Sequence, residues 1–186
     1  MALHPLMEQR RSLRAFDPNR PVPQEVLERL LEAARWAPSS GNMQPWRFVV
    51  VREPEALARA QQALRRGNQT WATKAPVLLI VCGDPDDDSI TDGKPYYLFD
   101  CGLAAENLIL QGVAEGLVMH PMLGWYEEPM RAALEIPANV RVVVVIAVGY
   151  PGRLEDLPED LQRRETAPRV RKPLSELVHY DRWEKR

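Results

Sequence analysis

The sequence predicts a single layered domain in which helices cover a β-sheet, of the α/β or the α+β class. Its 186 residues are enough for one domain with a sizeable core, so residues 1–186 are expected to form one unit. Segments of helical and of extended apolar periodicity alternate along the chain. One run, residues 77–82, is apolar throughout, which is typical of a central strand covered on both faces. Alternation by itself favours a parallel, doubly wound sheet.

The first half of the chain opens with helices that are clear in the apolar pattern. Val26, Leu30 and Ala34 recur at helical spacing. This helix ends at Ala37, because a residue that precedes proline is pushed out of the helical region. In chain order we expect a short helix at 6–11, a helix at 23–37, a strand at 48–51, a helix at 54–66 that Gly67 and Asn68 end, and the central strand at 77–82.

The second half continues the alternation. A polar stretch at 84–94 is expected to be a loop, and the long apolar helix after it stops at Gly116. In chain order we expect this helix at 97–115, a short strand at 118–120, a helix at 127–134 and a long strand at 140–148.

Residues 152–186 form a proline-punctuated, mostly polar tail with few side chains to bury. Such a segment is either disordered or packed across something larger. Residues 173–179 have the pattern of a one- or two-turn helix with an apolar face. We favour a C-terminal arm that lies against a partner subunit, since a partner would cover these apolar side chains.

Composition excludes several classes of protein. The 24 Lys and Arg residues against 26 Asp and Glu residues argue against a surface that grips nucleic acid or anionic lipid. No apolar run reaches the roughly 18 residues of a membrane span, and the first ten residues lack a signal-peptide core. Cys82 and Cys101 have no metal-ligand spacing and are expected to be buried free thiols. A cytoplasmic protein without a metal site is the expectation.

A basic cluster lies near the start of the chain, where Arg10, Arg11 and Arg14 surround Ser12. Clustered guanidinium groups and a hydroxyl suit a phosphate monoester, because arginine offers a rigid fork of donors. Taken alone, the cluster is more often a solvated basic face at a helix end.

Residues 37–48 form a long connection with two prolines, a glycine and several small polar side chains. This density of hydrogen-bonding groups favours ligand contact over an ordinary connecting loop. The glycine-rich phosphate motifs of dinucleotide-binding and P-loop proteins are absent from the sequence.

Residues 120–125 connect a strand to a helix. Gly124 could let the backbone approach a flat ligand closely, although a simple turn is at least as common a reason for a glycine there.

Taken together, these segments resemble the nitroreductase family of flavoproteins. The resemblance extends over nearly the whole chain and keeps the family's order of motifs. The matching motifs are R-R-S-x-R-x-F at 10–16, A-x-W-A-P-S-S-G-N-x-Q-P-W at 34–46, A-P-V-L-L-I-V at 75–81, D-x-G-x-A-x-E-N-L at 100–108, A-V-G-Y-P at 147–151 and R-K-P-L at 171–174.

The resemblance implies an α+β fold with a central mixed, largely antiparallel sheet flanked by helices. It also implies an intimate homodimer with two noncovalently bound FMN molecules at the interface, and C-terminal arms, here 152–186, that extend onto the partner subunit. This fold replaces the parallel sheet that alternation alone favours.

Several residues of the chain match the family's phosphate-binding and flavin-edge positions. Arg10, Arg11 and Ser12 match residues that hold the FMN phosphate and ribityl chain. Arg171 looks like the distal phosphate ligand, with Arg169 or Lys172 as substitutes. Arg14 and Asn68 match residues near the pyrimidine edge of the flavin.

Two further segments complete the implied cofactor site. Pro38, Ser39, Ser40 and Asn42 match the loop that the other subunit presents to the flavin. Pro121, Met122, Leu123 and Gly124 match the segment whose backbone lies beside the reactive N5 of the flavin.

The implied activity is hydride transfer from NAD(P)H, through flavin N5, to a small acceptor such as a nitroaromatic or a quinone, in a ping-pong cycle. Hydride transfer needs no acid, base or nucleophile from the protein, so no catalytic side chain is assigned. A cation at Arg14 would stabilise the anionic reduced flavin. Alternatives are a flavoprotein of the same fold with dehydrogenase, dehalogenase or flavin-destroying chemistry, and a nonenzymatic flavin-binding regulator.

The chain departs from the family at the expected rim of the substrate site. Several members carry an acidic residue at the position of Leu123, and the segment 84–97 is short here, which implies a more open, more apolar site. Tyr96, Tyr97 and Trp125 are rim candidates, although ordinary core packing is an equal reading for both tyrosines. We expect His120 to be a surface residue that follows a strand.

Overall fold

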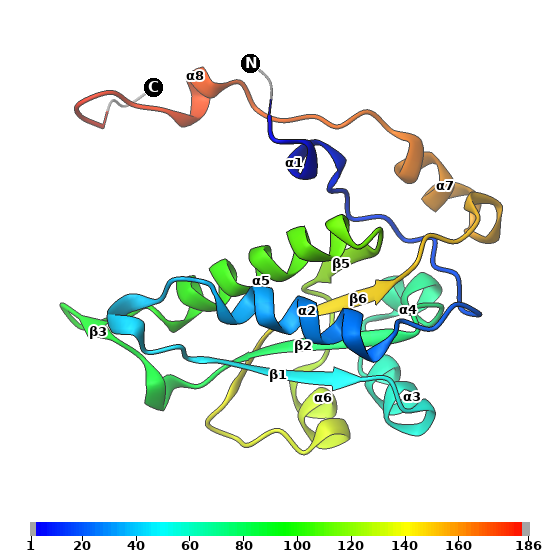
Figure 1. Cartoon of the computed structure of the whole chain (residues 1–186), viewed down its shortest axis with the longest axis horizontal. Coiled ribbons are helices and arrows are strands. Elements are labelled where there is room, and N and C mark those ends of the chain that lie inside the picture. The colour runs from blue at the N-terminus through cyan, green and yellow to red at the C-terminus, as the bar shows by residue number, and fades with distance from the viewer. Residues whose placement is uncertain (1–2, 184–186) are drawn as a thin grey trace.

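The computed structural model of the chain describes residues 3–183 and has a central four-stranded sheet (Figure 1). The strand order is β1 (Trp46–Val51), β2 (Val77–Gly83), β6 (Arg141–Gly149) and β5 (Val118–Met122). Every strand pair within the described residues is antiparallel. The parallel sheet that alternation favours is therefore wrong, and the antiparallel α+β arrangement that the resemblance implies is confirmed.

The order of the strands explains why alternation misleads. Helix α5 (Tyr97–Ala114) connects β2 to β5, and these two strands do run in the same direction, as one crossover helix requires. They are not neighbours, because β6 lies between them and pairs antiparallel with both. Strand order is a long-range property, so local periodicity does not contain it.

Strand β2 is the centre of the molecule, and all seven of its residues are buried. Leu78, Ile80 and Cys82 face one hydrophobic core. Val77, Leu79 and Val81 face the other. The continuous apolar run of the sequence arises because both faces of this strand are covered, as predicted.

Helices cover the two faces of the sheet unequally. Helices α2 (Gln24–Arg35) and α5 pack together on one face, over the core that contains Leu79 of β2. Helices α3 (Pro54–Gln62), α4 (Arg66–Ala72) and α6 (Glu127–Leu134) lie on the other face and contribute Ala60, Trp71 and Met130 to the second core (Figure 1).

The predicted helix 54–66 is wrong at its end. It stops at Gln62, and Gly67 and Asn68 lie inside the next helix, α4, instead of ending the previous one. The break falls at 63–65 because these backbone groups pair with the connection between β5 and α6. Tertiary hydrogen bonds therefore set this boundary.

The polar segment 84–94, predicted as a loop, holds a short helix (Pro85–Asp87) and a small hairpin of β3 (Ile90–Thr91) and β4 (Lys94–Pro95). Asp92 and Gly93 form its turn with positive φ angles of 51° and 71°. An Asp-Gly pair suits this turn, since its backbone twist matches that of the flanking strands.

The remaining predicted helices and strands agree with the structure to within about two residues. Cys82 and Cys101 are free and buried, as expected, and burial raises the pKa of their thiols to about 11 and about 12. Among residues 3–183 there is no helix with the length and apolarity needed to cross a membrane. The other short elements are α1 (Pro5–Gln9), η1 (Ser40–Asn42), η3 (Leu154–Asp156), α7 (Glu159–Thr166) and α8 (Leu174–Leu177).

The C-terminal segment leaves the sheet after β6, passes through α7 and runs beside α1 to α8 (Figure 1). We call its described part, residues 152–183, the arm. Helix α8 lies within the predicted helical stretch 173–179, whereas α7 is not anticipated from the sequence.

Candidate functional site

Residues 10–16, which we call the strap, connect α1 to the body of the protein. Phe16 is buried and forms a β-bridge with Pro151, at the point where the arm begins. The carbonyl oxygen of Leu13 lies 2.9 Å from Nδ1 of His120 on β5. The strap is thus fixed to the sheet at Leu13 and to the start of the arm at Phe16.

His120 is a buried residue, with 8% of its surface exposed, so the expectation of a surface histidine is wrong. Its ring lies 4.3 Å, centre to centre, from the ring of Trp71. Nδ1 carries the proton, because the Leu13 carbonyl can only accept a hydrogen bond. Burial lowers the pKa of His120 to about 4, so the ring is neutral at pH 7.

Arg14 is held by Glu165 of α7. The Glu165 carboxylate accepts the backbone N–H of Arg14 at 2.9 Å and its guanidinium at 3.1 Å, and the Glu165 side chain is only 6% exposed. The guanidinium also lies 5.8 Å from the ring centre of Trp71. Glu165 is not among the residues predicted from the sequence. The usable signal is that it follows the buried Leu161 by four residues, on the same face of a helix.

A second cluster of arginines forms where the strap meets the arm. Arg10 donates to the hydroxyl of Ser12 at 3.5 Å, and Arg11 donates to the carbonyl of Ala167 at 2.8 Å. Arg169 donates to the carbonyls of Met7 and Glu8 at the end of α1. Within the described chain none of these three guanidinium groups has a carboxylate at ion-pair distance. The donor set, three cations and a hydroxyl, suits an anion.

The other two arm cations lie differently. Arg171 is exposed and donates to the carbonyl of its own neighbour, Val170, at 2.8 Å, and Lys172 is exposed as well. Of the three arm cations considered from the sequence, Arg169 is the one that contacts the segment just before the strap.

The connection between β5 and α6 is joined to the start of α4. The Gly124 carbonyl accepts hydrogen bonds from the backbone N–H of Arg65 at 2.8 Å and from the Asn68 side chain at 3.1 Å. A Cβ atom at position 124 would lie 2.6 Å from Nδ2 of Asn68, so this close approach requires glycine. The structure therefore brings the predicted residues Asn68 and Gly124 into direct contact.

The neighbours of Gly124 divide between core and surface. Pro121 and Met122 belong to β5, where Met122 is buried in the core, and Leu123 is 80% exposed. Trp125 is half-buried and pairs with Leu64. The Met122 side chain therefore packs in the hydrophobic core.

The strap and the Gly124 connection belong to one region. His120 binds the strap two residues before Met122 on the same strand. The Trp71 ring is tilted against the His120 ring and lies 5.8 Å from the Arg14 guanidinium. Trp71 follows Asn68 by about one turn of α4. Arg14, Asn68 and Gly124 are therefore connected, through Trp71 and His120, along β5 and the connection that follows it.

Within one chain, the loop 37–45 lies apart from Arg14, Asn68 and Gly124. The hydroxyl of Ser39 accepts the backbone N–H of Gln44, and the backbone N–H of Ser40 donates to the buried carboxylate of Asp100 at 3.1 Å. Pro38 and Asn42 are exposed, and Gly41, Asn42 and Gln44 have positive φ angles. Figure 1 shows this loop at the left-hand end of the molecule, near β3 and away from the strap.

The two tyrosines of the expected rim also lie apart from Gly124, at the start of α5. Tyr97 packs against the end of β2, where a Cβ on Gly83 would come within 2.6 Å of its ring, in agreement with the core-packing reading. Tyr96 is exposed and donates its backbone N–H to Asp88.

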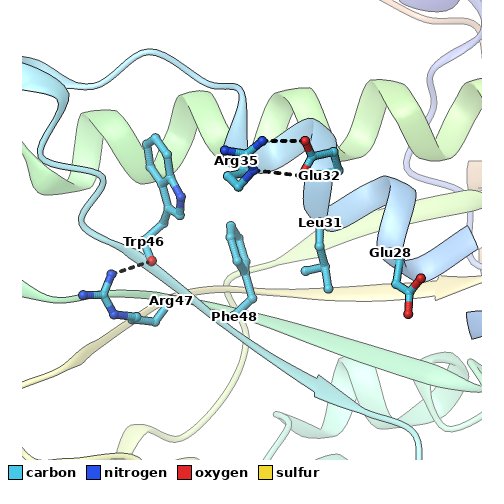
Figure 2. Close-up of a pocket in the computed structure, with 7 residues that line it drawn as sticks. All are labelled: Glu28, Leu31, Glu32, Arg35, Trp46, Arg47 and Phe48. Atoms are coloured by element: carbon cyan, nitrogen blue, oxygen red, sulfur yellow. Dashed lines mark hydrogen bonds and ion pairs between the residues drawn. The ribbon is translucent and has the colours of Figure 1, made fainter. Parts of the chain in front are cut away.

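A groove of about 550 Å³ opens between α2 and the free edge of β1. Figure 2 shows Leu31 and Phe48 in this groove. Arg35 donates two hydrogen bonds to the Glu32 carboxylate, and Arg47 donates one to the carbonyl of Trp46. None of the residues that line this groove is a predicted site residue, and its other lining residue is Glu28.

Comparison with known proteins assigns a family to this arrangement. The model of the nitroreductase family matches residues 7–150. A crystal structure described as an oxidoreductase containing FMN superposes with a TM-score of 0.90 at 35% identity, over 100% of this chain and 95% of that chain.

Two curated relatives carry more specific names. An Archaeoglobus fulgidus protein with the provisional name NADH dehydrogenase/NAD(P)H nitroreductase is 37% identical over 157 residues, which cover 81% of this chain and 86% of that protein. An iodotyrosine deiodinase of Haliscomenobacter hydrossis is 32% identical over 192 residues, which cover 87% of this chain and 84% of that enzyme.

Proposed function

The chain belongs to the nitroreductase family, and on this premise we propose that it is an FMN-dependent oxidoreductase that transfers a hydride from NAD(P)H to a small organic acceptor. The observation that carries the proposal is a pair of features that the strap connects through its contacts with His120 and Trp71. One is the arginine cluster at the junction of strap and arm, and the other is the contact between Asn68 and Gly124.

The arginine cluster fits the phosphate of FMN. A phosphate monoester carries close to two negative charges at pH 7 and offers three strong acceptor oxygens. Arg10, Arg11 and Arg169 have no carboxylate partner among residues 3–183, and Ser12 adds a hydroxyl. We assign the phosphate to Arg10, Arg11 and Ser12, with the arm providing a further cation from Arg169, Arg171 or Lys172.

Bound FMN would supply the hydride-accepting and hydride-donating atom, N5, which no side chain of the protein provides. Asn68 and the backbone beside Gly124 would hold the ring and its edge, with Pro121, Met122 and Leu123 completing that segment. Arg14 would place a cation near the edge that gains negative charge. Because Glu165 already binds Arg14, this cation is partly neutralised, and it would stabilise a reduced flavin less than a free arginine would.

We also propose that the site is completed by a second copy of the chain. Pro38, Ser39, Ser40 and Asn42 lie away from the strap in one chain, so they reach a flavin at the strap only from a partner subunit. The arm carries exposed apolar side chains that a partner would cover. A homodimer satisfies both requirements.

The hydride donor and the acceptor would occupy the same place in turn, which gives a ping-pong cycle. The open surface beside Gly124, where Leu123 is 80% exposed, supports this order because it leaves room for each ligand in turn.

The test is a visible spectrum of the purified protein, recorded without oxygen before and after addition of NADH or NADPH. We expect a yellow protein whose flavin bands bleach, and whose colour returns when a nitroaromatic or a quinone is added. A protein that purifies without flavin and takes up none would contradict the proposal. Bound FMN that neither nicotinamide bleaches would favour a nonenzymatic flavin-binding protein.

Reductive dehalogenation is a second candidate, since one relative of similar coverage is an iodotyrosine deiodinase. Release of iodide from iodotyrosine by the reduced protein, measured with an iodide electrode, distinguishes it. Turnover of nitroaromatics without iodide release would exclude this alternative.

A further inference from the structure

A second groove, of about 480 Å³, lies directly beside the contact between Asn68 and Gly124. Three structural segments meet around it: the residue before α4, the connection after β5 and the first turn of α6. The residues that line it are Arg65, Leu123, Trp125, Tyr126, Glu127, Glu128 and Pro129.

The walls of this groove are joined by backbone hydrogen bonds. Arg65 donates its backbone N–H to the Gly124 carbonyl at 2.8 Å, and Tyr126 donates its backbone N–H to the Ala63 carbonyl at 2.8 Å. Between them, Leu64 and Trp125 form a β-bridge. The backbone of the groove is therefore preformed, and ligand binding does not carry the ordering cost of a mobile loop.

The groove combines apolar and aromatic surface with one cation. Leu123, Trp125 and Tyr126 supply the apolar and aromatic surface, and the Arg65 guanidinium lies 5.1 Å from the centre of the Tyr126 ring. Within the described part of the chain, no carboxylate lies within ion-pair distance of Arg65.

The two acidic residues at the groove lie close to an arginine other than Arg65. Glu127 is bound by Arg131 of α6 at 2.9 Å. The Glu128 side chain is 87% exposed, and its carboxylate lies 4.0 Å from Nε of Arg131. Arg65 thus presents a cation to the groove, and its stacking on an aromatic ring orients the planar guanidinium.

We propose that this groove is the acceptor site, and that it selects planar aromatic acceptors that carry a carboxylate. The carboxylate binds the Arg65 guanidinium, and the aromatic ring packs on Trp125 and Leu123, next to the backbone of Gly124. This inference rests on the proposed function, because it assumes that the flavin lies beside Gly124. For a nitroaromatic acceptor the reaction is Ar–NO₂ + NAD(P)H + H⁺ → Ar–NO + NAD(P)⁺ + H₂O.

The test compares two acceptors of similar size, 4-nitrobenzoate and the neutral 4-nitrobenzyl alcohol, in the FMN-loaded protein. In Arg65→Gln we expect kcat/KM for 4-nitrobenzoate to fall about 10- to 100-fold, the factor for one charge-assisted hydrogen bond, with kcat/KM for the alcohol unchanged. Arg65→Lys should retain part of the preference. Arg66→Gln, an exposed neighbour outside the groove, is the matched control and should behave as wild type.

Three results would overturn the proposal. Equal losses for both acceptors would indicate general damage, and no loss for either would show that Arg65 does not touch the acceptor. A rise in KM for NADPH alone would mean that the anion bound by Arg65 is a phosphate of the hydride donor.

A direct binding measurement separates this inference from the proposed function. If neither NADH nor NADPH bleaches the flavin of the wild-type holoenzyme, the proposed function fails, and calorimetric binding of 4-nitrobenzoate still tests whether the groove binds the carboxylate. Binding that weakens about 10- to 100-fold in Arg65→Gln supports the site, whereas no binding, or equal binding by both proteins, refutes it.

Discussion

The body of the protein buries its apolar side chains, whereas the arm leaves many of its own exposed. In β2 every residue is buried, and the helices of two cores cover both faces of the strand. In the arm, five large apolar or aromatic side chains are 59–82% exposed: Val170, Leu174, Leu177, Tyr180 and Trp183. The body completes its own core, whereas the arm has the composition of a segment that packs on another surface.

The strap is supported by both regions. His120 fixes it to the body at Leu13. Glu165 and the Ala167 carbonyl fix it to the arm at Arg14 and Arg11. Because the strap carries the proposed phosphate ligands, changes in the arm and in the body should affect flavin binding by different routes.

The largest expected effect comes from removal of the arm. A chain that ends before Pro168 should fail to form the proposed dimer and should bind much less FMN, because it lacks the apolar side chains of α8 and the cations at 169, 171 and 172. Light scattering and the visible spectrum measure the two losses.

A full-length variant separates the arm's apolar contacts from its charges. Leu174→Ser combined with Leu177→Ser should weaken the dimer, and Ser175→Ala on the same helix should not. A truncated protein that stays yellow and dimeric would refute this role of the arm.

The next largest effect is expected at the ion pair between the two regions. Glu165→Ala leaves Arg14 without its partner and should lower the free energy of unfolding by about 3 kcal/mol, the lower end of the range for a buried pair, since Arg14 keeps some exposure. Glu165→Gln keeps hydrogen-bond acceptance and should lose less. Urea unfolding measures both. Glu159→Ala, an exposed carboxylate of the same helix, is the control, and an equal loss there would contradict the assignment.

Removal of one phosphate ligand should have a smaller effect. Arg10→Ala should weaken FMN binding about 10- to 100-fold, because it removes one charge-assisted hydrogen bond while Arg11 and Ser12 remain. Fluorescence titration with FMN measures this loss. Arg59→Ala, an exposed arginine of α3, should bind FMN as wild type does. Unchanged occupancy in Arg10→Ala would show that the phosphate lies elsewhere.

The smallest effect concerns the attachment of the strap to the body, and it depends on pH. The pKa of His120 is about 4 in the folded protein and about 6.5 when unfolded, so the unfolded chain binds a proton first as pH falls. The contribution of neutral His120 to stability is present above pH 6.5 and is lost towards pH 4. Between pH 6.5 and 5 this loss is about 1.5 kcal/mol.

A variant isolates this effect from the other titrating groups. His120→Gln can still donate to the Leu13 carbonyl and does not titrate, so its unfolding free energy should fall less over the same pH range. Urea unfolding at several pH values checks the difference between the two proteins. Parallel curves for the two proteins would show that His120 does not titrate as proposed.

The sequence by itself determined the elements and the family. Apolar periodicity gave the central strand and most helix boundaries, because a buried face imposes a period on its own segment. The motifs around Arg10, Pro38 and Gly124 indicated the site residues, since hydrogen-bonding groups and a glycine stand out against an apolar pattern. These features are local, and a linear reading can detect them.

The tertiary structure alone decided which strands are neighbours, where the helix after β1 breaks, and what holds the strap. In the sequence, Glu165 resembles an ordinary surface carboxylate and His120 a residue that follows a strand. In the folded protein both are buried, Glu165 against Arg14 and His120 against Trp71. The placement of β6 between β2 and β5 likewise depends on packing between distant segments. Such contacts join residues far apart in the chain, so no local pattern records them.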